Sequence, residues 1–318
     1  MLVAPTSAQS PAPAAARRRV AIVLGAGGPV GHAFHAGVLA ALSRVMGWAP
    51  DDADLLLGTS AGAQVAALVR AGMSPRDLMA RCTGEPMSSH GADIAECFVR
   101  PHSGGPPPEY RRRWWRPAAP RYLLRSLLTP WTLRLRRFVA ALLPAGGIDL
   151  DPMAAGLRRL FGERWSTRPL WVTAVNLWSG RRVAFGRSGA PATDVGSAVA
   201  SSGAVPGLCA PVLVGGSPHI DGGFASTTSV DLLYGERYEQ VIISAPLSMY
   251  RPLRLAIRRR ASKLQRLGSR VLLLEPRGEA LARMGYNPMD AARAPAVTHA
   301  AFAQALGELE QAAPSLAL

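Results

Sequence analysis

The feature that most constrains the fold is a pair of glycine-rich turns, each lying between a short apolar run and a helical pattern. Residues 20–24 form a β-branched run that ends at the first turn, residues 25–31, and residues 32–46 then carry apolar side chains at helical spacing. Residues 54–57 and 61–70 repeat this order around the second turn. Strand, turn and helix in alternation predict an α/β fold with a mainly parallel sheet.

Further strands are expected in the second half of the chain, at residues 170–176, 182–185, 212–214, 241–244 and 271–274. The longest uncharged stretch, residues 195–220, contains glycine and proline in its second half. A membrane-spanning helix needs about 18 or more apolar residues without such breakers, so this stretch is interpreted as strand and loop.

Composition divides the chain into three parts. Residues 1–18 form an alanine- and proline-rich tail whose charges follow its apolar residues, the reverse of a secretory signal, so we expect a cytoplasmic protein. Residues 19–246 carry the α/β pattern, with an insertion at about residues 84–147 that is rich in arginine, tryptophan and proline and is expected to be part loop and part helix. Residues 247–318 supply a basic helix, a last strand and a closing helix that we expect to pack on the same domain.

Composition also excludes several classes of protein. With 48% hydrophobic and 18% charged residues, the chain can bury a core and is not intrinsically disordered. Its three cysteines (Cys82, Cys97 and Cys209) are scattered without CxxC spacing, which argues against a disulfide framework and against a zinc site. We therefore predict no metal and no cofactor.

The formal net charge of +15 is concentrated in two windows. Residues 100–137 hold ten arginines against one acidic residue, and residues 251–270 hold seven arginines and one lysine with no acidic residue. The rest of the chain is slightly acidic. A basic patch beside a neutral body suggests an anionic partner, which could be a membrane surface, an acidic lipid or a nucleic acid.

The sharpest local motif is a G-x-S-x-G sequence formed by Gly58, Ser60 and Gly62 between a predicted strand and a predicted helix. A serine nucleophile on such a turn is held in strained backbone geometry, and small neighbours let the chain pass close by. The N-terminus of the following helix points its N–H groups at developing negative charge. An ordinary glycine-rich turn capped by serine is the alternative, and the strand–turn–helix context favours the catalytic interpretation.

The first glycine-rich turn, residues 25–31, fits neither common nucleotide motif. The dinucleotide fingerprint requires a glycine where Val30 stands, and a P-loop requires a lysine that this segment lacks. What remains is a loop of backbone N–H groups before a helix, which suits an oxyanion as well as a phosphate. A turn that only allows close packing of strand and helix is the alternative.

A third motif, Asp221 followed by two glycines, comes after the predicted strand at residues 212–214. An aspartate before glycines is often only a turn. The functional interpretation is a carboxylate held at a strand end, facing the serine.

Together, the three motifs resemble the patatin-like phospholipase family, and the combination is highly specific. Residues 31–39 are similar to the family's helix after the oxyanion loop, and residues 200–207 with the following Pro211 and Val212 are similar to its segment before the aspartate. The resemblance covers most of residues 20–83 and 167–246. It implies a three-layer α/β/α fold with a mainly parallel central sheet.

The resemblance also implies a Ser–Asp dyad without histidine. Ser60 would attack the ester carbonyl, and Asp221 would accept the proton of the serine hydroxyl group. The N–H groups of Gly27, Gly28 and the turn around Ser60, called the nucleophile elbow, would stabilise the oxyanion. The elbow itself would depend on Gly58 and Gly62.

The chain departs from the family pattern in the oxyanion loop. Ala26 replaces a glycine, Val30 stands where an arginine is expected, and one extra residue separates Gly31 from Gly37. Because backbone N–H donors do not depend on side chains, we expect the hole to form without any contribution from a guanidinium group.

A triad of Ser60, Asp221 and His299 is the alternative catalytic arrangement, since it matches the chain order of α/β-hydrolases. His299 lies in alanine-rich helical sequence, however, and that fold places several strands before its elbow. The dyad is therefore favoured, and the histidines are expected to be surface or packing residues.

The basic insertion interleaves arginine with tryptophan and leucine, a composition that suits a lipid headgroup region. Nucleic-acid binding, a protein interface and a solvated basic face are its competitors. We predict a lipid or lipophilic ester substrate, an anionic membrane surface on the inner face as a partner, and no nucleic acid. The alternative function is a catalytically weak patatin-like protein that binds anionic membranes or a protein partner through this insertion. The candidate surface residues are Arg111, Arg112, Arg113, Trp114 and Trp115.

Overall fold

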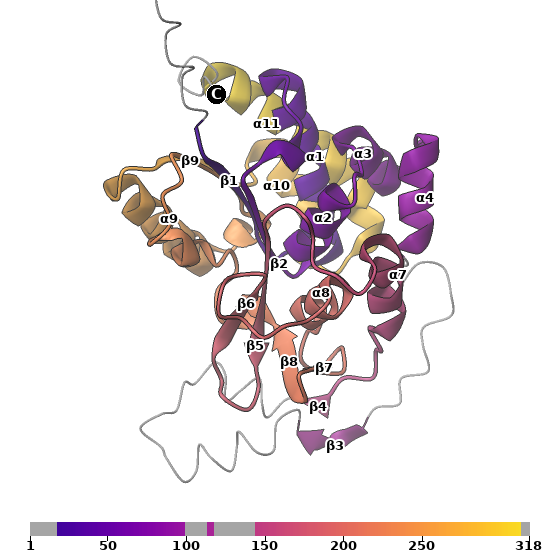
Figure 1. The fold of residues 1–318 in the computed structure, drawn as a ribbon. Coiled ribbons are helices and arrows are strands. Elements are labelled where there is room, and N and C mark those ends of the chain that lie inside the picture. The colour runs from indigo at the N-terminus through magenta and orange to yellow at the C-terminus, as the bar shows by residue number, and fades with distance from the viewer. Residues whose placement is uncertain (1–17, 99–112, 118–143, 313–318) are drawn as a thin grey trace, which may run out of the picture.

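The computed structural model describes residues 18–98, 113–117 and 144–312, and its centre is an eight-stranded sheet with helices on both faces (Figure 1). The strand order is β10-β9-β1-β2-β5-β8-β7, and β6 also pairs with β5. The strands are β1 (Val20–Leu24), β2 (Leu55–Thr59), β5 (Leu170–Asn176), β6 (Arg182–Phe185), β7 (Val212–Val214), β8 (Ser217–Asp221), β9 (Gln240–Ser244) and β10 (Arg270–Leu274). A separate antiparallel pair is formed by β3 (Arg113–Pro117) and β4 (Pro144–Ala145).

The sheet is mainly parallel, as the sequence predicts. Strands β10, β9, β1, β2 and β5 run parallel to their neighbours, whereas β6, β7 and β8 form the antiparallel part. The α-helices are α1 (Gly28–Met46), α2 (Ala61–Arg70), α3 (Pro75–Thr83), α4 (Ser89–Cys97), α7 (Asp151–Phe161), α8 (Val195–Gly203), α9 (Arg251–Arg266), α10 (Gly278–Met284) and α11 (Ala294–Ala312). Short 3-10 turns are η1 (Pro50–Asp52), η3 (Gly222–Phe224), η4 (Val230–Leu233), η5 (Pro246–Met249) and η6 (Ala291–Arg293).

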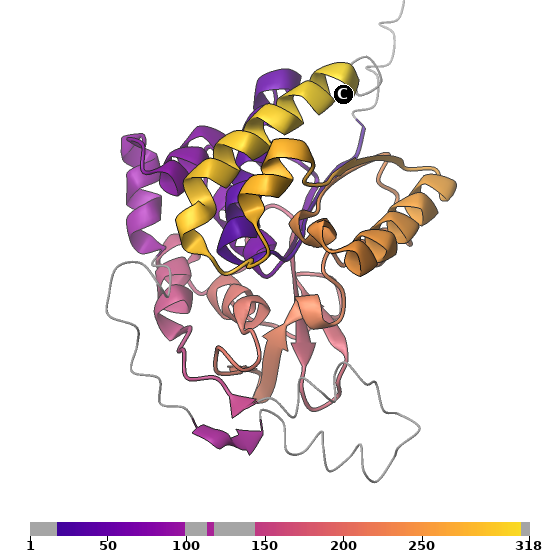
Figure 2. The same ribbon diagram turned by 180° about the vertical axis from the view of Figure 1, so that it is seen from behind.

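Two hydrophobic cores lie on opposite faces of the sheet because successive side chains of a strand point to opposite faces. In β1, Ile22 and Leu24 belong to the larger core, and Ala21 and Val23 belong to the smaller one. Helices α1, α2, α7, α8 and α11 pack on the larger core, and α9 with η4 packs on the smaller one. Figure 2 shows the resulting three layers from behind, with α9 on one side of the sheet and α1, α10 and α11 on the other.

The structure corrects the prediction for residues 195–220. Instead of strand and loop, residues 195–203 form α8, whose first turn is capped by Asp194, because its carboxylate accepts the Ser197 N–H at 2.8 Å. Arg158 on α7 adds an ion pair to Asp194 at 3.2 Å. The chain then enters β7 and β8, and β8 is a strand that the sequence analysis did not predict.

Other boundaries shift less. Helix α1 begins at Gly28 and so takes over the second half of the predicted glycine turn, and β2 extends to Thr59. Within the predicted insertion at residues 84–147, the structure describes α4, β3 and β4. Residues 99–112 and 118–143 lie outside the described part of the chain.

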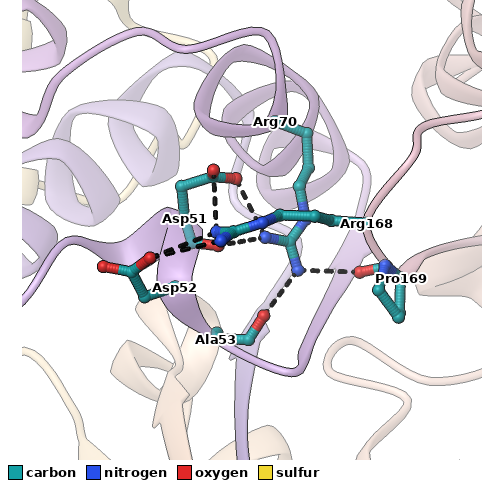
Figure 3. A network of polar contacts seen from close by, with 6 residues as sticks. All are labelled: Asp51, Asp52, Ala53, Arg70, Arg168 and Pro169. Atoms are coloured by element: carbon teal, nitrogen blue, oxygen red, sulfur yellow. Dashed lines mark hydrogen bonds and ion pairs between the residues drawn. The ribbon is translucent and has the colours of Figure 1, made fainter.

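A polar network joins the amino ends of β2 and β5 (Figure 3). The side chain of Arg70, at the end of α2, is fully buried and pairs with Asp51 at 2.9 Å. Its guanidinium group also donates to the carbonyl oxygens of Ala53 at 2.8 Å and Pro169 at 2.9 Å. Arg168 binds the same aspartate from the solvent side. These contacts connect the segments that lead into both strands, at the end of the strands opposite to Ser60.

Candidate active site

Strand β5 brings the predicted serine and aspartate to the same level of the sheet. It pairs in parallel with β2, Thr173 opposite Thr59, and antiparallel with β8, Ala174 opposite Asp221. Strand β8 therefore ends where β2 ends, although the two strands run in opposite directions. Because β6 pairs with residues 172–175 of β5 from the other side, β2 and β8 lie end to end on one side of β5. Ser60 follows β2 directly, so the nucleophile candidate and the base candidate meet where the two strand ends face each other.

Ser60 has the backbone conformation of a nucleophile elbow. Its φ of 55° and ψ of −120° are unusual for a residue with a side chain, and α2 begins at the next residue. Gly58 and Gly62 make this turn possible. A Cβ atom on Gly58 would lie 2.4 Å from the Cα of Ala63, and one on Gly62 would lie 2.0 Å from the carbonyl oxygen of Leu24. Both positions therefore require glycine.

The hydroxyl group of Ser60 lies close enough to the carboxylate of Asp221 to lower its pKa. Both residues are buried, with exposed fractions of 6% and 4%. Burial raises the pKa of Asp221 to about 6, and the nearby Ser60 hydroxyl group and the Gly223 N–H, which donates to the carboxylate at 2.7 Å, oppose that rise. Asp221 is thus a carboxylate of increased basicity in contact with the serine.

The glycine loop borders the same pocket. The N–H groups of the neighbouring residues already donate to backbone carbonyl oxygens, and Pro29 has no N–H group. Gly25 donates to Ser244, Ala26 to Thr227, Val30 to Pro288 and Gly31 to Gly27. Within the described residues, no hydrogen bond is recorded for the N–H of Gly27 or Gly28. Both glycines line the pocket that contains Ser60, and their role as oxyanion donors stays a prediction.

The elbow contributes differently. The N–H of Ser60 donates to the hydroxyl oxygen of Ser202 on α8 at 2.8 Å. Ser60 cannot offer that group to a substrate, and the N–H of the following residue, Ala61, is the elbow donor that such turns supply. Sequence reasoning missed Ser202, because its role depends on the packing of α8 against α2.

A pocket of about 820 Å³ opens at Ser60 and Asp221, within the range of ligand-binding cavities. Its wall is largely apolar, and the larger apolar side chains come from Leu150, Val205, Leu208, Phe224, Leu247 and Leu253. Cys209 also lines it, and burial raises the pKa of its thiol to about 11, with a smaller contribution from Asp221, so this cysteine stays protonated. The pocket suits an acyl chain whose polar end lies at the serine.

The histidines do not form the alternative triad. His299 lies on α11 with 57% of its side chain exposed, and its Nε2 is 3.8 Å from Glu85. The triad of Ser60, Asp221 and His299 is therefore wrong. His32, expected to be a surface or packing residue, lines the pocket.

His35 supports the glycine loop from below. It is fully buried, with Nε2 2.8 Å from the carbonyl oxygen of Gly25 and Nδ1 2.7 Å from the hydroxyl of Ser244. Burial lowers the pKa of His35 to about 4, so the ring is neutral at neutral pH. One nitrogen can then donate to Gly25 while the other accepts from Ser244, which ties the loop to β9.

The predicted surface residues of the basic insertion lie partly outside the described residues. Arg111 and Arg112 are outside the described residues, and Arg113, Trp114 and Trp115 lie in β3, for which only the backbone is described. In the described ranges, no three histidine, cysteine or acidic side chains gather as a metal site would require. Nor does any helix there have the length and apolarity needed to cross a membrane.

The comparison with family models agrees with this architecture. The family model described as patatin-like phospholipase matches residues 22–234. Among solved structures, VipD from Legionella pneumophila is similar, with a TM-score of 0.42 and 13% identity over 92% of this chain and 67% of that chain. A likeness this distant carries no information on activity. No curated protein matches the sequence.

Proposed function

The chain belongs to the patatin-like phospholipase family, and on that premise we propose that it is a serine acyl hydrolase that cleaves carboxylic ester bonds of membrane phospholipids or related lipid esters. The observation that carries the proposal is that Ser60, in its elbow conformation, and Asp221 are both buried and line one largely apolar pocket. Within the family's general activity on lipid esters, this pair supplies a nucleophile and a base.

In the first step, the Oγ of Ser60 attacks the ester carbonyl carbon while its proton passes to Asp221. A carboxylate is a weak base for a hydroxyl group. The raised pKa of Asp221, about 6, makes the carboxylate a stronger base, and a general base works best with a pKa near the working pH. The alcohol leaves as the tetrahedral intermediate collapses, and it takes the proton from Asp221.

The negative charge that develops on the carbonyl oxygen is met by the N–H groups of Gly27, Gly28 and Ala61. The loss of one such donor typically costs about 2.7–4 kcal/mol of transition-state stabilisation. These donors belong to the backbone, so Ala26 and Val30, where the family carries other residues, leave them in place. Val30 is fully buried in the larger core and contributes packing.

In the second step, water attacks the acyl-enzyme with Asp221 again as the base, and the fatty acid leaves as Ser60 regains its proton. The apolar pocket holds the acyl chain throughout. Because burial of apolar surface contributes roughly 25 cal/mol per Å², long acyl chains should bind better than short ones.

For the membrane partner we keep the sequence-based proposal, an anionic surface on the inner face contacted by the basic insertion at residues 100–137. Its residues Arg111 to Trp115 are the candidates. A catalytically weak protein that binds membranes or a protein partner through the same insertion is the second candidate function, favoured by the departures in the glycine loop.

An active-site fluorophosphonate probe separates the two functions. The parent protein should be labelled and Ser60→Ala should not, while Ser89→Ala, which alters an exposed serine of α4, should be labelled like the parent. A folded parent that takes up no label, and that releases no fatty acid from phospholipid vesicles, would favour the binding function instead.

A further inference from the structure

Helix α9 is strongly basic, and the structure pairs only part of its charge. Arg258 binds Glu275 at 2.6 Å, and Arg260 lies 3.8 Å from Asp231. The ammonium group of Lys263 lies over the ring of Tyr234, 4.6 Å from its centre. For Arg251, Arg259 and Arg266, no ion pair is recorded among the described residues, and all three are exposed.

The unpaired arginines share one face of the helix. Ile257, Ala261 and Leu264 are buried against the sheet and define the inner face of α9. At 100° per residue, Arg251, Leu255, Arg259 and Arg266 fall within about 80° of one another on the side away from that face. Leu255 is an apolar side chain in this stripe, yet 52% of it is exposed.

The beginning of α9 borders the mouth of the active-site pocket. Leu253 lines the pocket, and the hydroxyl group of Tyr250 donates to the carbonyl oxygen of Tyr286 at 2.6 Å. That bond connects α9 to the loop after α10, whose Met289 also lines the pocket. Tyr286 is 92% exposed and Met289 is 40% exposed. Met289, which lines the pocket, and the nearby Tyr286 are therefore exposed beside the first turn of α9, where the stripe begins.

We propose that the stripe of Arg251, Leu255, Arg259 and Arg266, with the loop side chains of Tyr286 and Met289, docks on an anionic lipid bilayer with the pocket mouth towards the lipid. The inference rests on the proposed lipid substrate and adds residues that lie outside the basic insertion in the sequence. Arginines bind headgroup phosphates, and Tyr, Leu and Met favour the boundary between headgroups and acyl chains. A nucleic acid would also attract the arginines, but it gives no reason for apolar side chains at the rim of an apolar pocket.

The test measures binding to vesicles in the Ser60→Ala background, so that no lipid is hydrolysed during sedimentation. One variant adds Arg251→Gln, Arg259→Gln and Arg266→Gln. The matched control instead replaces three exposed arginines of α1, α3 and the α7–β5 connection: Arg44→Gln, Arg76→Gln and Arg164→Gln. Both variants lose the same charge and keep the basic insertion. Thermal unfolding checks that each is folded.

The α9 variant should bind phosphatidylglycerol vesicles more weakly than its parent, by up to roughly a hundredfold, because each arginine near an anionic surface contributes about fivefold. The control should bind nearly as well as the parent, and phosphatidylcholine vesicles should bind all three proteins weakly. Equal losses in the two variants, or no loss in either, would overturn the docking surface, as would binding to RNA that depends on α9 without binding to vesicles. Hydrolysis of a short soluble ester by the protein with Ser60 intact tests the proposed function separately.

Discussion

The backbone N–H of Ser60 donates a hydrogen bond to the hydroxyl oxygen of Ser202 at 2.8 Å, although 142 residues separate the two in sequence. The bond holds the first residue before α2 against α8. Since Ser60 has a strained conformation that the surrounding structure must maintain, Ser202 is part of what maintains it.

We therefore predict that Ser202→Ala lowers kcat more than it raises KM, because the elbow loses its support while the pocket is unchanged. The unsatisfied, buried N–H should also reduce the free energy of unfolding by about 1–3 kcal/mol. Steady-state kinetics and urea unfolding measure the two effects.

The neighbouring serine provides the control. Ser201 is equally buried, but its hydroxyl group donates to the carbonyl of Ser197 within α8. Ser201→Ala should leave kcat close to that of the parent. Equal effects of the two substitutions on kcat would mean that only the packing of α8 matters.

The pH dependence of hydrolysis should follow Asp221. A protonated carboxyl group cannot accept the serine proton, and burial raises the pKa of Asp221 to about 6. We expect kcat/KM for a soluble ester to rise about tenfold per pH unit below about pH 6 and to level off above it. A profile that is flat through pH 6 and falls only near pH 4 would contradict the role of a buried base.

The same carboxylate should make the protein less stable at neutral pH. In the folded state Asp221 keeps its proton up to about pH 6, whereas in the unfolded chain it loses the proton near its ordinary value of 3.8. The folded state therefore binds more protons in this window, and stability falls as the pH rises from about 4 to about 6.

Asp221→Asn removes this effect and should abolish hydrolysis. At pH 7 the variant should be more stable than the parent by up to about 3 kcal/mol, since a tenfold difference in proton affinity between the folded and unfolded states corresponds to about 1.4 kcal/mol. The difference should shrink towards pH 4. Chemical unfolding of both proteins across this range measures it, and a variant that is less stable than the parent at pH 7 would contradict the prediction.

The polar network of Arg70 is expected to affect stability without affecting chemistry. Arg70→Met would leave the carbonyl oxygens of Ala53 and Pro169 without their donor at the starts of β2 and β5. We expect a loss of about 2–4 kcal/mol in the free energy of unfolding. Because the network lies at the end of the strands opposite to Ser60, kcat of the folded variant should be close to that of the parent. Arg168→Met, which alters an exposed partner of Asp51, should cost less than about 1 kcal/mol.

Much of this arrangement is local in origin and could be predicted from the sequence. The β-branched run at residues 20–24 and the G-x-S-x-G turn are local patterns, and the structure has a strand and a strand–turn–helix unit at those places. Strand β8 was missed because Ser217–Asp221 contains a proline and lacks alternating apolar residues. It exists because β5 and β7 pair with it on either side. Helix α8 was missed because its serines and glycines have weak helix propensity. Tertiary packing against α7 and α2 stabilises the helix instead.

The contacts around the candidate site join segments that are far apart in the sequence. Pro288 and Met289 reach the glycine loop from the last quarter of the chain, and Ser202 reaches Ser60 from α8. No periodicity or motif in those segments indicates such contacts. They follow from the three-dimensional order of the strands, which sequence spacing alone did not provide.

The glycine loop gives the last prediction, at Gly28. This residue has a φ of 59°, in the left-handed region, and a Cβ atom there would lie 2.6 Å from the carbonyl oxygen of Pro288. Gly47, at the end of α1, has a φ of 60° but open space around its Cα. Gly28→Ala and Gly47→Ala should therefore share the conformational cost of about 1 kcal/mol that a side chain pays in this region.

Only Gly28→Ala should also push the loop away from Pro288 and displace the N–H groups of Gly27 and Gly28. If those groups form the oxyanion hole, its kcat should fall by about 100-fold or more, as for the loss of one donor. Gly47→Ala should keep the parent kcat. Comparable kcat in both variants would show that the loop serves only to pack β1 against α1, and the oxyanion donors would then have to be sought elsewhere in the pocket.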